Sequence, residues 1–337
     1  MLRSIILSAF TSVFVFAGIS SASTLDDVRA KGFIQCGVSQ GLFGFSSQND
    51  AGDWEGLDVD LCRAVAVAVF GDRSAVKFSP LSAKQRFTAL SSGEIDILAR
   101  NSTWTMTRDT QLGLNFTGVN YYDGQGMMVP TSLGVSSAME LDGANICTNT
   151  GTTTELNITD FFRSNNMSFN LVAFEKADEV AAAYDAGRCD VYTTDTSGLA
   201  AQRLKLTNPN AHTVLPTIIS KEPLGPVVRQ GDDQWFNIVK WVHFAMVNAE
   251  EMGINSSNVD MMKSSEDPGI KRLLGTEGSF GQELGLSADW AHLIIKHVGN
   301  YGESFENNVG PKTPVNLPRG VNNLWTNGGI MYAPPVR

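Results

Sequence analysis

The sequence lacks most of the short motifs that identify common enzyme and metal-binding classes. It contains no G-x-x-x-x-G-K-[ST] phosphate loop and no G-x-G-x-x-G segment. None of the four histidines belongs to an H-E-x-x-H arrangement, and none of the four cysteines belongs to a C-x-x-C pair. Catalysis therefore has little support in the sequence, which predicts neither a cofactor nor a metal site.

Charge is also scarce, and its sign is informative. Only 18% of the 337 residues are charged, 35 Asp+Glu exceed 25 Lys+Arg, and the formal net charge is −10. A nucleic-acid-binding protein needs clustered cations to displace counterions, so nucleic acid is not expected as a partner. The hydrophobic fraction of 42% suffices for ordinary cores. The length corresponds to about two domains at ~150 residues each.

The chain has no hydrophobic run long enough for a typical membrane span. Residues 1–22 contain an early cation, Arg3, then an apolar stretch over residues 5–19 and small residues up to Ala22. This pattern predicts a secretory signal peptide cleaved after Ala22. The alternative is a membrane anchor, but a spanning helix needs ~20 consecutive apolar residues. We therefore expect the mature protein to be exported.

Export changes the meaning of the cysteines, because separated cysteines tend to pair in an oxidising compartment. The chain is expected to form two lobes, which are described below. Cys36 and Cys62 fall in one lobe, and Cys147 and Cys189 fall in the other. We expect one disulfide within each of these pairs. The alternative is four buried free thiols.

Strand and helix patterns alternate along the chain, which predicts an α/β protein. The expected strands cover residues 33–38, 76–78, 95–98, 144–147, 170–174 and 190–194. The expected helices begin near residues 57, 82, 154, 177 and 196.

Two extended segments rich in Gly and Pro, residues 126–130 and 224–229, have the character of crossovers between lobes. They predict a discontinuous first lobe of residues 23–126 plus 229–337, into which a second lobe of residues 127–228 is inserted. The C-terminal tail from residue 307 is expected to wrap the surface.

Two polar loops follow strand ends, one in each lobe. Residues 101–108 read Asn-Ser-Thr-Trp-Thr-Met-Thr-Arg, and residues 148–154 form a Thr-rich turn that opens a helix. Arg108 offers a bidentate fork for a carboxylate, and the loops offer hydroxyl and backbone N–H donors. Asp195, at another strand end, offers an anion for a cationic group. Ordinary helix caps with a surface arginine are the alternative, but one arginine plus one aspartate across a crevice describes a receptor for a zwitterion.

Residues 56–66, which read GLDVDLCRAVA, resemble the signature of family 3 periplasmic solute-binding proteins of polar amino-acid ABC importers. Further landmarks occur in the family's order, at residues 93–96, 103–108, 141–143, 150–152 and 189–195. Residues 121–126, 187–190 and 221–225 resemble the general L-amino-acid-binding subgroup. The resemblance implies a type II periplasmic-binding-protein fold with two hinge strands and a ligand in the inter-lobe cleft.

The resemblance also implies ligand contacts. Arg108 would bind the α-carboxylate with help from Thr103 and the second loop, and Asp195 and the carbonyl of Asn101 would hold the α-ammonium. The second-loop residues concerned are Thr150, Thr152 and Thr153. Asp58 and Asp60 would be structural, capping and orienting the first helix.

Two positions that would face the ligand side chain, Ser39 and Ala83, are smaller than in relatives of narrow specificity, which implies broad specificity. The implied partners are a free L-amino acid and an inner-membrane ABC permease, with the protein acting as a monomer and not as an enzyme. A secreted cyclohexadienyl dehydratase on the same fold is the alternative.

Overall fold

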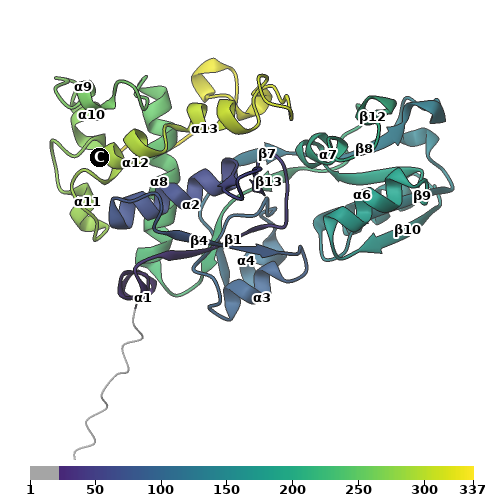
Figure 1. Ribbon diagram of the computed structural model, residues 1–337, viewed down its shortest axis with the longest axis horizontal. Helices are drawn as coiled ribbons and strands as arrows, with labels where there is room; N and C mark the ends of the chain where they lie inside the picture. Colours follow the sequence, from purple (N-terminus) through teal and green to yellow (C-terminus); the bar gives the residue numbers. More distant parts are fainter. Residues whose placement is uncertain (1–22) are drawn as a thin grey trace, which may run out of the picture.

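The computed structural model describes residues 23–337 and has two lobes joined by a narrow waist (Figure 1). The predicted signal peptide, residues 1–22, lies outside the described residues. Each lobe is built on a five-stranded sheet with helices against it, which confirms the predicted α/β class.

The first lobe has the sheet order β4-β1-β5-β14-β6. Strand β1 pairs in parallel with β4 and β5, while β14 runs antiparallel to β5 and β6. The strands are β1 (Ile34–Ser39), β4 (Val76–Leu81), β5 (Ile97–Leu98), β6 (Leu114–Phe116) and β14 (Val227–Arg229). The associated helices are α1 (Thr24–Lys31), α2 (Leu57–Phe70), α3 (Arg86–Ser91) and α4 (Met106–Gln111), and a small ribbon pairs β2 (Ser47–Gln48) with β3 (Trp54–Glu55).

The second lobe has the sheet order β10-β9-β11-β8-β12. Strands β10, β9 and β11 are parallel, so their carboxyl ends meet at one edge that faces the first lobe. The strands are β8 (Gln125–Pro130), β9 (Ala144–Asn149), β10 (Phe169–Phe174), β11 (Val191–Asp195) and β12 (His212–Val214). The helices are α5 (Thr153–Ser164), α6 (Ala177–Asp185) and α7 (Thr196–Arg203), with short 3₁₀ turns at Thr131–Leu133, Ala138–Glu140 and Pro209–Ala211.

The two lobes are connected by an antiparallel pair of short strands, β7 (Tyr121–Asp123) and β13 (Glu222–Leu224). The sequence placed the crossovers at residues 126–130 and 224–229, and this was wrong by a few residues. Strand β8 belongs to the second sheet, because it pairs with β11 and β12, and β14 belongs to the first, because it pairs with β5 and β6. The lobe boundaries at residues 126 and 229 remain a proposal.

The chain after β14 packs against the first lobe. Helix α8 (Asp233–Glu251) is followed by α9 (Val259–Met262), α10 (Pro268–Leu273), α11 (Phe280–Glu283), α12 (Trp290–His297), α13 (Tyr301–Asn308) and 3₁₀ turns at Gly320–Asn322 and Trp325–Asn327. The tail does more than wrap the surface, because Leu324, Met331 and Val336 join the main hydrophobic core. Within residues 23–337, no helix combines the length and hydropathy needed to cross a bilayer.

Both predicted disulfides are present. Cys36 on β1 is bonded to Cys62 on α2, with Cα atoms 6.3 Å apart. Cys147 on β9 is bonded to Cys189 just before β11, with Cα atoms 5.7 Å apart. Each bond ties a helix or loop to a central strand of its own lobe.

Candidate functional site

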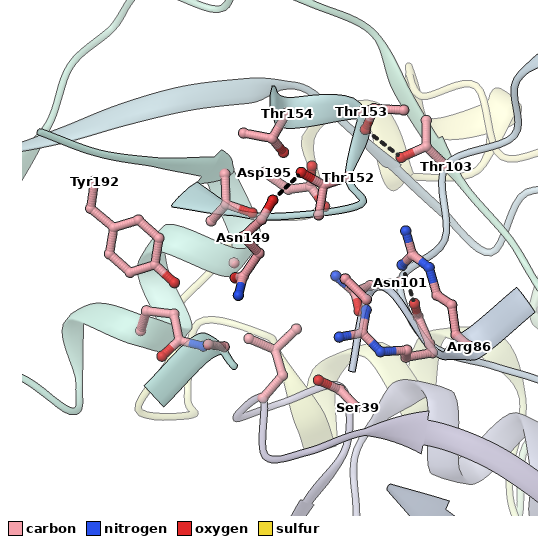
Figure 2. Close-up of a pocket in the computed structure, with 17 residues that line it drawn as sticks. Ser39, Arg86, Asn101, Thr103, Asn149, Thr152, Thr153, Thr154, Tyr192 and Asp195 are labelled. Atoms are coloured by element: carbon pink, nitrogen blue, oxygen red, sulfur yellow. Dashed lines mark hydrogen bonds between the residues drawn. The ribbon is translucent and has the colours of Figure 1, made fainter. Parts of the chain in front are cut away.

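A cavity of about 50 Å³ lies between the lobes, at the carboxyl ends of strands from both sheets. By the same measure a single water needs ~10–15 Å³, so the cavity has room for a small polar molecule. Most of the predicted ligand residues line it: Ser39, Ala83, Asn101, Thr103, Thr152, Thr153 and Asp195. Figure 2 shows Ser39, Arg86, Asn101 and Thr103 on one side and Asn149, Thr152 and Asp195 on the other.

The first-lobe wall is shaped by the loop after β5. Asn101 adopts a left-handed conformation with φ of 32°, which Asn tolerates better than most residues. Its backbone N–H donates to the buried carboxylate of Asp58 at 2.9 Å, and Asn120 donates to the other oxygen at 3.2 Å. Helix α2 begins at Leu57, and its N-cap residue, Gly56, has no side chain to cap it. The expectation that Asp58 caps this helix is wrong, because its carboxylate instead orients the binding loop.

Arg108 is not among the described residues that line the cavity. Its side chain is buried behind the loop, where Nη1 donates to the Thr103 carbonyl at 2.9 Å and the guanidinium stacks on Phe87 at 4.9 Å. Thr150 does not line the cavity either, because its N–H donates to the Phe174 carbonyl at the end of the neighbouring strand.

Two arginines that the sequence reasoning missed, Arg86 and Arg100, do line the cavity. Arg100 donates from Nε to the Leu81 carbonyl at 2.9 Å. Arg86 is 3% exposed, its Nε has no hydrogen-bond partner among the described residues, and its Nη1 reaches the Arg100 carbonyl only at 3.4 Å. The Arg86 guanidinium projects toward the space between the lobes (Figure 2). Arg100 could have been predicted from the sequence, because it follows the same buried strand that led us to select Asn101.

These arginines form a positively charged cluster. Burial lowers the pKa of Arg86 well below its usual value, and the neighbouring charges of Arg108 and Arg100 lower it further. Burial also lowers the pKa of Arg100 to about 10. Because buried cations without a direct partner are costly, this wall is built to receive negative charge.

The second-lobe wall contains the start of helix α5. Thr152 is the N-cap residue, whose hydroxyl accepts from the Glu155 N–H at 3.3 Å and donates to the Asn149 carbonyl at 2.7 Å. The first backbone N–H groups of a helix lack partners within the helix and carry partial positive charge. Because Thr153 and Thr154 both line the cavity, this helix start faces the cavity and is suited to bind an anion there.

Asp195 ends strand β11 and contributes the acidic side of the cavity. Burial raises its pKa well above the ordinary value, and the nearby carboxylates of Asp123 and Glu222 raise it further. The positive charges of Arg86 and Arg108 act in the opposite direction. A cationic group in the cavity would favour the ionised form of Asp195.

Glu222, on hinge strand β13, was also missed. One carboxylate oxygen accepts from the hydroxyls of Thr103 at 2.6 Å and Thr153 at 2.9 Å, and the other accepts from Asn157 at 2.7 Å. Thr103 belongs to the first lobe and the other two donors to helix α5. These bonds therefore join the lobes directly behind the cavity.

Residues 34–255 match the family described as bacterial extracellular solute-binding proteins, family 3. The match covers well over half of the chain. The chain belongs to this family. The predicted resemblance is confirmed, and with it the two-lobed type II fold with two hinge strands.

Members of the family and a solved structure match nearly the whole chain. The General L-amino acid-binding periplasmic protein AapJ of Rhizobium johnstonii is 61% identical over 96% of this chain and 95% of its own length. The Glutamate/glutamine/aspartate/asparagine-binding protein BztA of Rhodobacter capsulatus is 53% identical over the full length of both. A periplasmic binding protein from Brucella ovis, solved with glutathione bound, is 58% identical over 94% of this chain and all of that chain, with a TM-score of 0.92.

One further pattern bears on catalysis. Residues 37–41 read Gly-Val-Ser-Gln-Gly, the letters of a G-x-S-x-G nucleophile elbow. Such an elbow needs a sharp strand-to-helix turn and a histidine beside the serine. Strand β1 ends at Ser39 and is followed by turns, and no histidine is among the described residues that line the cavity. Ser39 is therefore a wall residue of a binding site.

Proposed function

We propose that this chain is the periplasmic substrate-binding component of an ABC importer and captures free L-α-amino acids between its two lobes. The observation that carries this proposal is the cavity itself, which has buried guanidinium groups on its first-lobe wall and both the start of α5 and the carboxylate of Asp195 on its second-lobe wall. Opposite charges fixed on both lobes match a zwitterion. The names of the near-full-length relatives agree with this chemistry.

The ligand would be anchored at both ends of its α-carbon. Thr103 and the backbone N–H groups of Thr152 and Thr153 bind the α-carboxylate, while Asp195 and the Asn101 carbonyl bind the α-ammonium. Arg108 supports this site from outside the cavity, because its guanidinium donates to the Thr103 carbonyl. Each charge-assisted bond contributes about 1.5–3 kcal/mol, so four or five give micromolar or tighter binding after ordering costs.

Arg86 and Arg100 refine the proposed ligand class. These two guanidinium groups line the cavity, with Arg108 behind the loop, and their charge exceeds what one α-carboxylate needs, so the site favours amino acids that carry a second acidic group. BztA is named for acidic amino acids and their amides, and glutathione in the Brucella ovis protein also carries two carboxylates. Broad specificity follows if neutral side chains still fit beside the small Ser39 and Ala83.

Capture would proceed by closure of the lobes. Direct hydrogen bonds cross the cleft in the described arrangement: Ser82 donates to Glu175 at 3.1 Å and Lys205 donates to the Gly41 carbonyl at 2.6 Å. Closure expels water and strengthens every charged contact inside the cleft. The closed form is then recognised by an inner-membrane permease, and the protein acts as an exported monomer in the periplasm.

Isothermal titration calorimetry tests the proposal. The mature chain, unfolded and refolded to remove copurifying ligand, is titrated with L-amino acids, their D-isomers and glutathione. At least one L-amino acid is expected to bind with micromolar or lower Kd, and Asp195→Asn should abolish that binding. Asp50→Asn, at an exposed position in the turn after β2, is the matched control. An intact refolded protein that binds no L-amino acid would contradict the proposal.

The dehydratase alternative is not supported by the relatives described above, which are named for binding. An enzyme on this fold would need an acid that drives elimination from a ligand without an ammonium group. The polar contacts of the cavity instead pair an acid with several donors, as a zwitterion requires.

A further inference from the structure

The C-terminal tail packs against one of the two hinge strands, β7. Strand β7 pairs with β13 along one edge, and its other edge faces the 3₁₀ turn at Gly320–Asn322. We propose that Asn322 is a positioning residue that fixes β7 and thereby sets how tightly the lobes retain ligand, a role that rests on the proposed function.

The Asn322 side chain makes the two hydrogen bonds to Tyr122 that a neighbouring strand would make. The backbone N–H of Tyr122 donates to Asn322 Oδ1 at 2.6 Å, and Asn322 Nδ2 donates to the Tyr122 carbonyl at 3.0 Å. Across the hinge Tyr122 lies opposite Pro223, whose carbonyl accepts from the Trp104 N–H at 2.8 Å and not from Tyr122. One buried side chain, 3% exposed, therefore satisfies both backbone groups in the middle of the hinge strand.

Asn322 is itself held rigidly against the first lobe. The guanidinium of Arg319 donates to the Asn322 carbonyl at 3.2 and 3.1 Å and pairs with both oxygens of Glu250 at 2.9 and 3.2 Å. Glu250 belongs to helix α8. The same guanidinium lies over the rings of Tyr301 and Phe305 at 5.2 and 4.9 Å.

Helix α13 holds the residues just before. The Tyr301 hydroxyl donates to the Asn120 carbonyl at 2.9 Å, and the Phe305 ring stacks on Tyr121 with centroids 6.1 Å apart. Residues 120, 121 and 122 are thus each contacted by the chain beyond residue 255, where the family match ends. Figure 1 shows α13 and the yellow C-terminal segment on the first-lobe side near β7.

The held strand leads directly to the ligand site. Asp123 follows Tyr122, and its carboxylate accepts from the Thr196 hydroxyl at 2.5 Å and from the Ser197 N–H at 3.3 Å at the start of α7. Asp195 immediately precedes this helix. Hinge closure is absorbed by backbone rotations in a few connecting residues. The hydrogen bonds between Asn322 and Tyr122 therefore limit the positions that Asp195 can reach relative to the first lobe.

Asn322→Ala removes both bonds to Tyr122, and Asn327→Ala, an exposed change in the same tail, is the matched control. We expect Asn322→Ala to raise the Kd for the best L-amino acid about tenfold, mainly through faster dissociation. Small-angle X-ray scattering should give the ligand-free variant a larger radius of gyration than the wild type. Tyr301→Phe, which removes only one hydroxyl, should shift Kd in the same direction by a smaller factor.

A role confined to stability would lower the unfolding temperature of Asn322→Ala while leaving the Kd, the dissociation rate and the radius of gyration at wild-type values. That result would overturn the proposal. Wild-type protein that binds no amino acid would instead refute the proposed function, and the scattering comparison of ligand-free proteins would still decide the role of Asn322.

Discussion

Arg86 offers the sharpest test of how the site selects its ligand. Arg86→Met keeps most of the side-chain length of a residue that is 3% exposed. It removes a guanidinium whose hydrogen bonding among residues 23–337 is limited to the 3.4 Å contact with the Arg100 carbonyl. Loss of one hydrogen-bonded ion pair to a second ligand carboxylate is worth about 1.5–3 kcal/mol, or roughly 10- to 100-fold in Kd. The Kd for L-glutamate should rise by this factor, whereas the Kd for L-glutamine should change by less than about threefold.

The same substitution should stabilise the ligand-free protein. Removing a buried cation without a direct partner is expected to raise the free energy of unfolding by about 1–3 kcal/mol. Calorimetry with both amino acids and urea denaturation without ligand measure the two effects, with Arg73→Met as an exposed control of equal charge change. Equal losses for glutamate and glutamine, together with reduced stability, would refute the assignment of Arg86 to a second acidic group.

Three further predictions follow from the buried groups. Burial raises the pKa of Asp195, and a bound ammonium group would lower it again. Ligand binding should therefore release a proton, and the affinity should rise with pH. Identical binding heats in buffers of different ionisation enthalpy would contradict this proton release. Burial lowers the pKa of His243 to about 4 from 6.5, so the unfolded chain takes up the proton first and stability should fall by up to ~3 kcal/mol as pH decreases from 6.5 to 4. His243→Gln should flatten this dependence in urea titrations at several pH values, and an unchanged slope would exclude His243 as its source. Replacing Cys147 and Cys189 by Ser opens a loop with a sequence separation of 42 and should cost about 3–4 kcal/mol by chemical denaturation, whereas wild-type stability would show that the bond contributes nothing.

Local patterns predicted the lobes well, because short-range rules determine where strands and helices begin. Helix α2 has the expected apolar spacing and ends at Gly71, which takes the left-handed conformation that favours glycine. The disulfides could be predicted because each pair lies within one lobe. The crossing strands were misplaced because Gly and Pro mark both hinge strands and the sheet strands next to them.

Only part of the site could be predicted from the sequence, because the direction of a side chain depends on tertiary packing. Arg108 has the spacing of a ligand residue, yet packing on Phe87 keeps it behind Thr103. Arg86 lies in an ordinary helical pattern, and only the fold brings its guanidinium to the cavity. The contacts of Glu222 and Asn322 span long sequence separations, so no local signal could reveal them.

Calorimetric titration of ligand-free mature protein with free L-amino acids tests the central claim most directly. The account predicts a 1:1 complex with micromolar or lower Kd for at least one L-α-amino acid, tightest for those with an acidic side chain, and no such complex with Asp195→Asn. Binding to carboxylic acids that lack an α-ammonium group, with equal affinity and no dependence on Asp195, would contradict it.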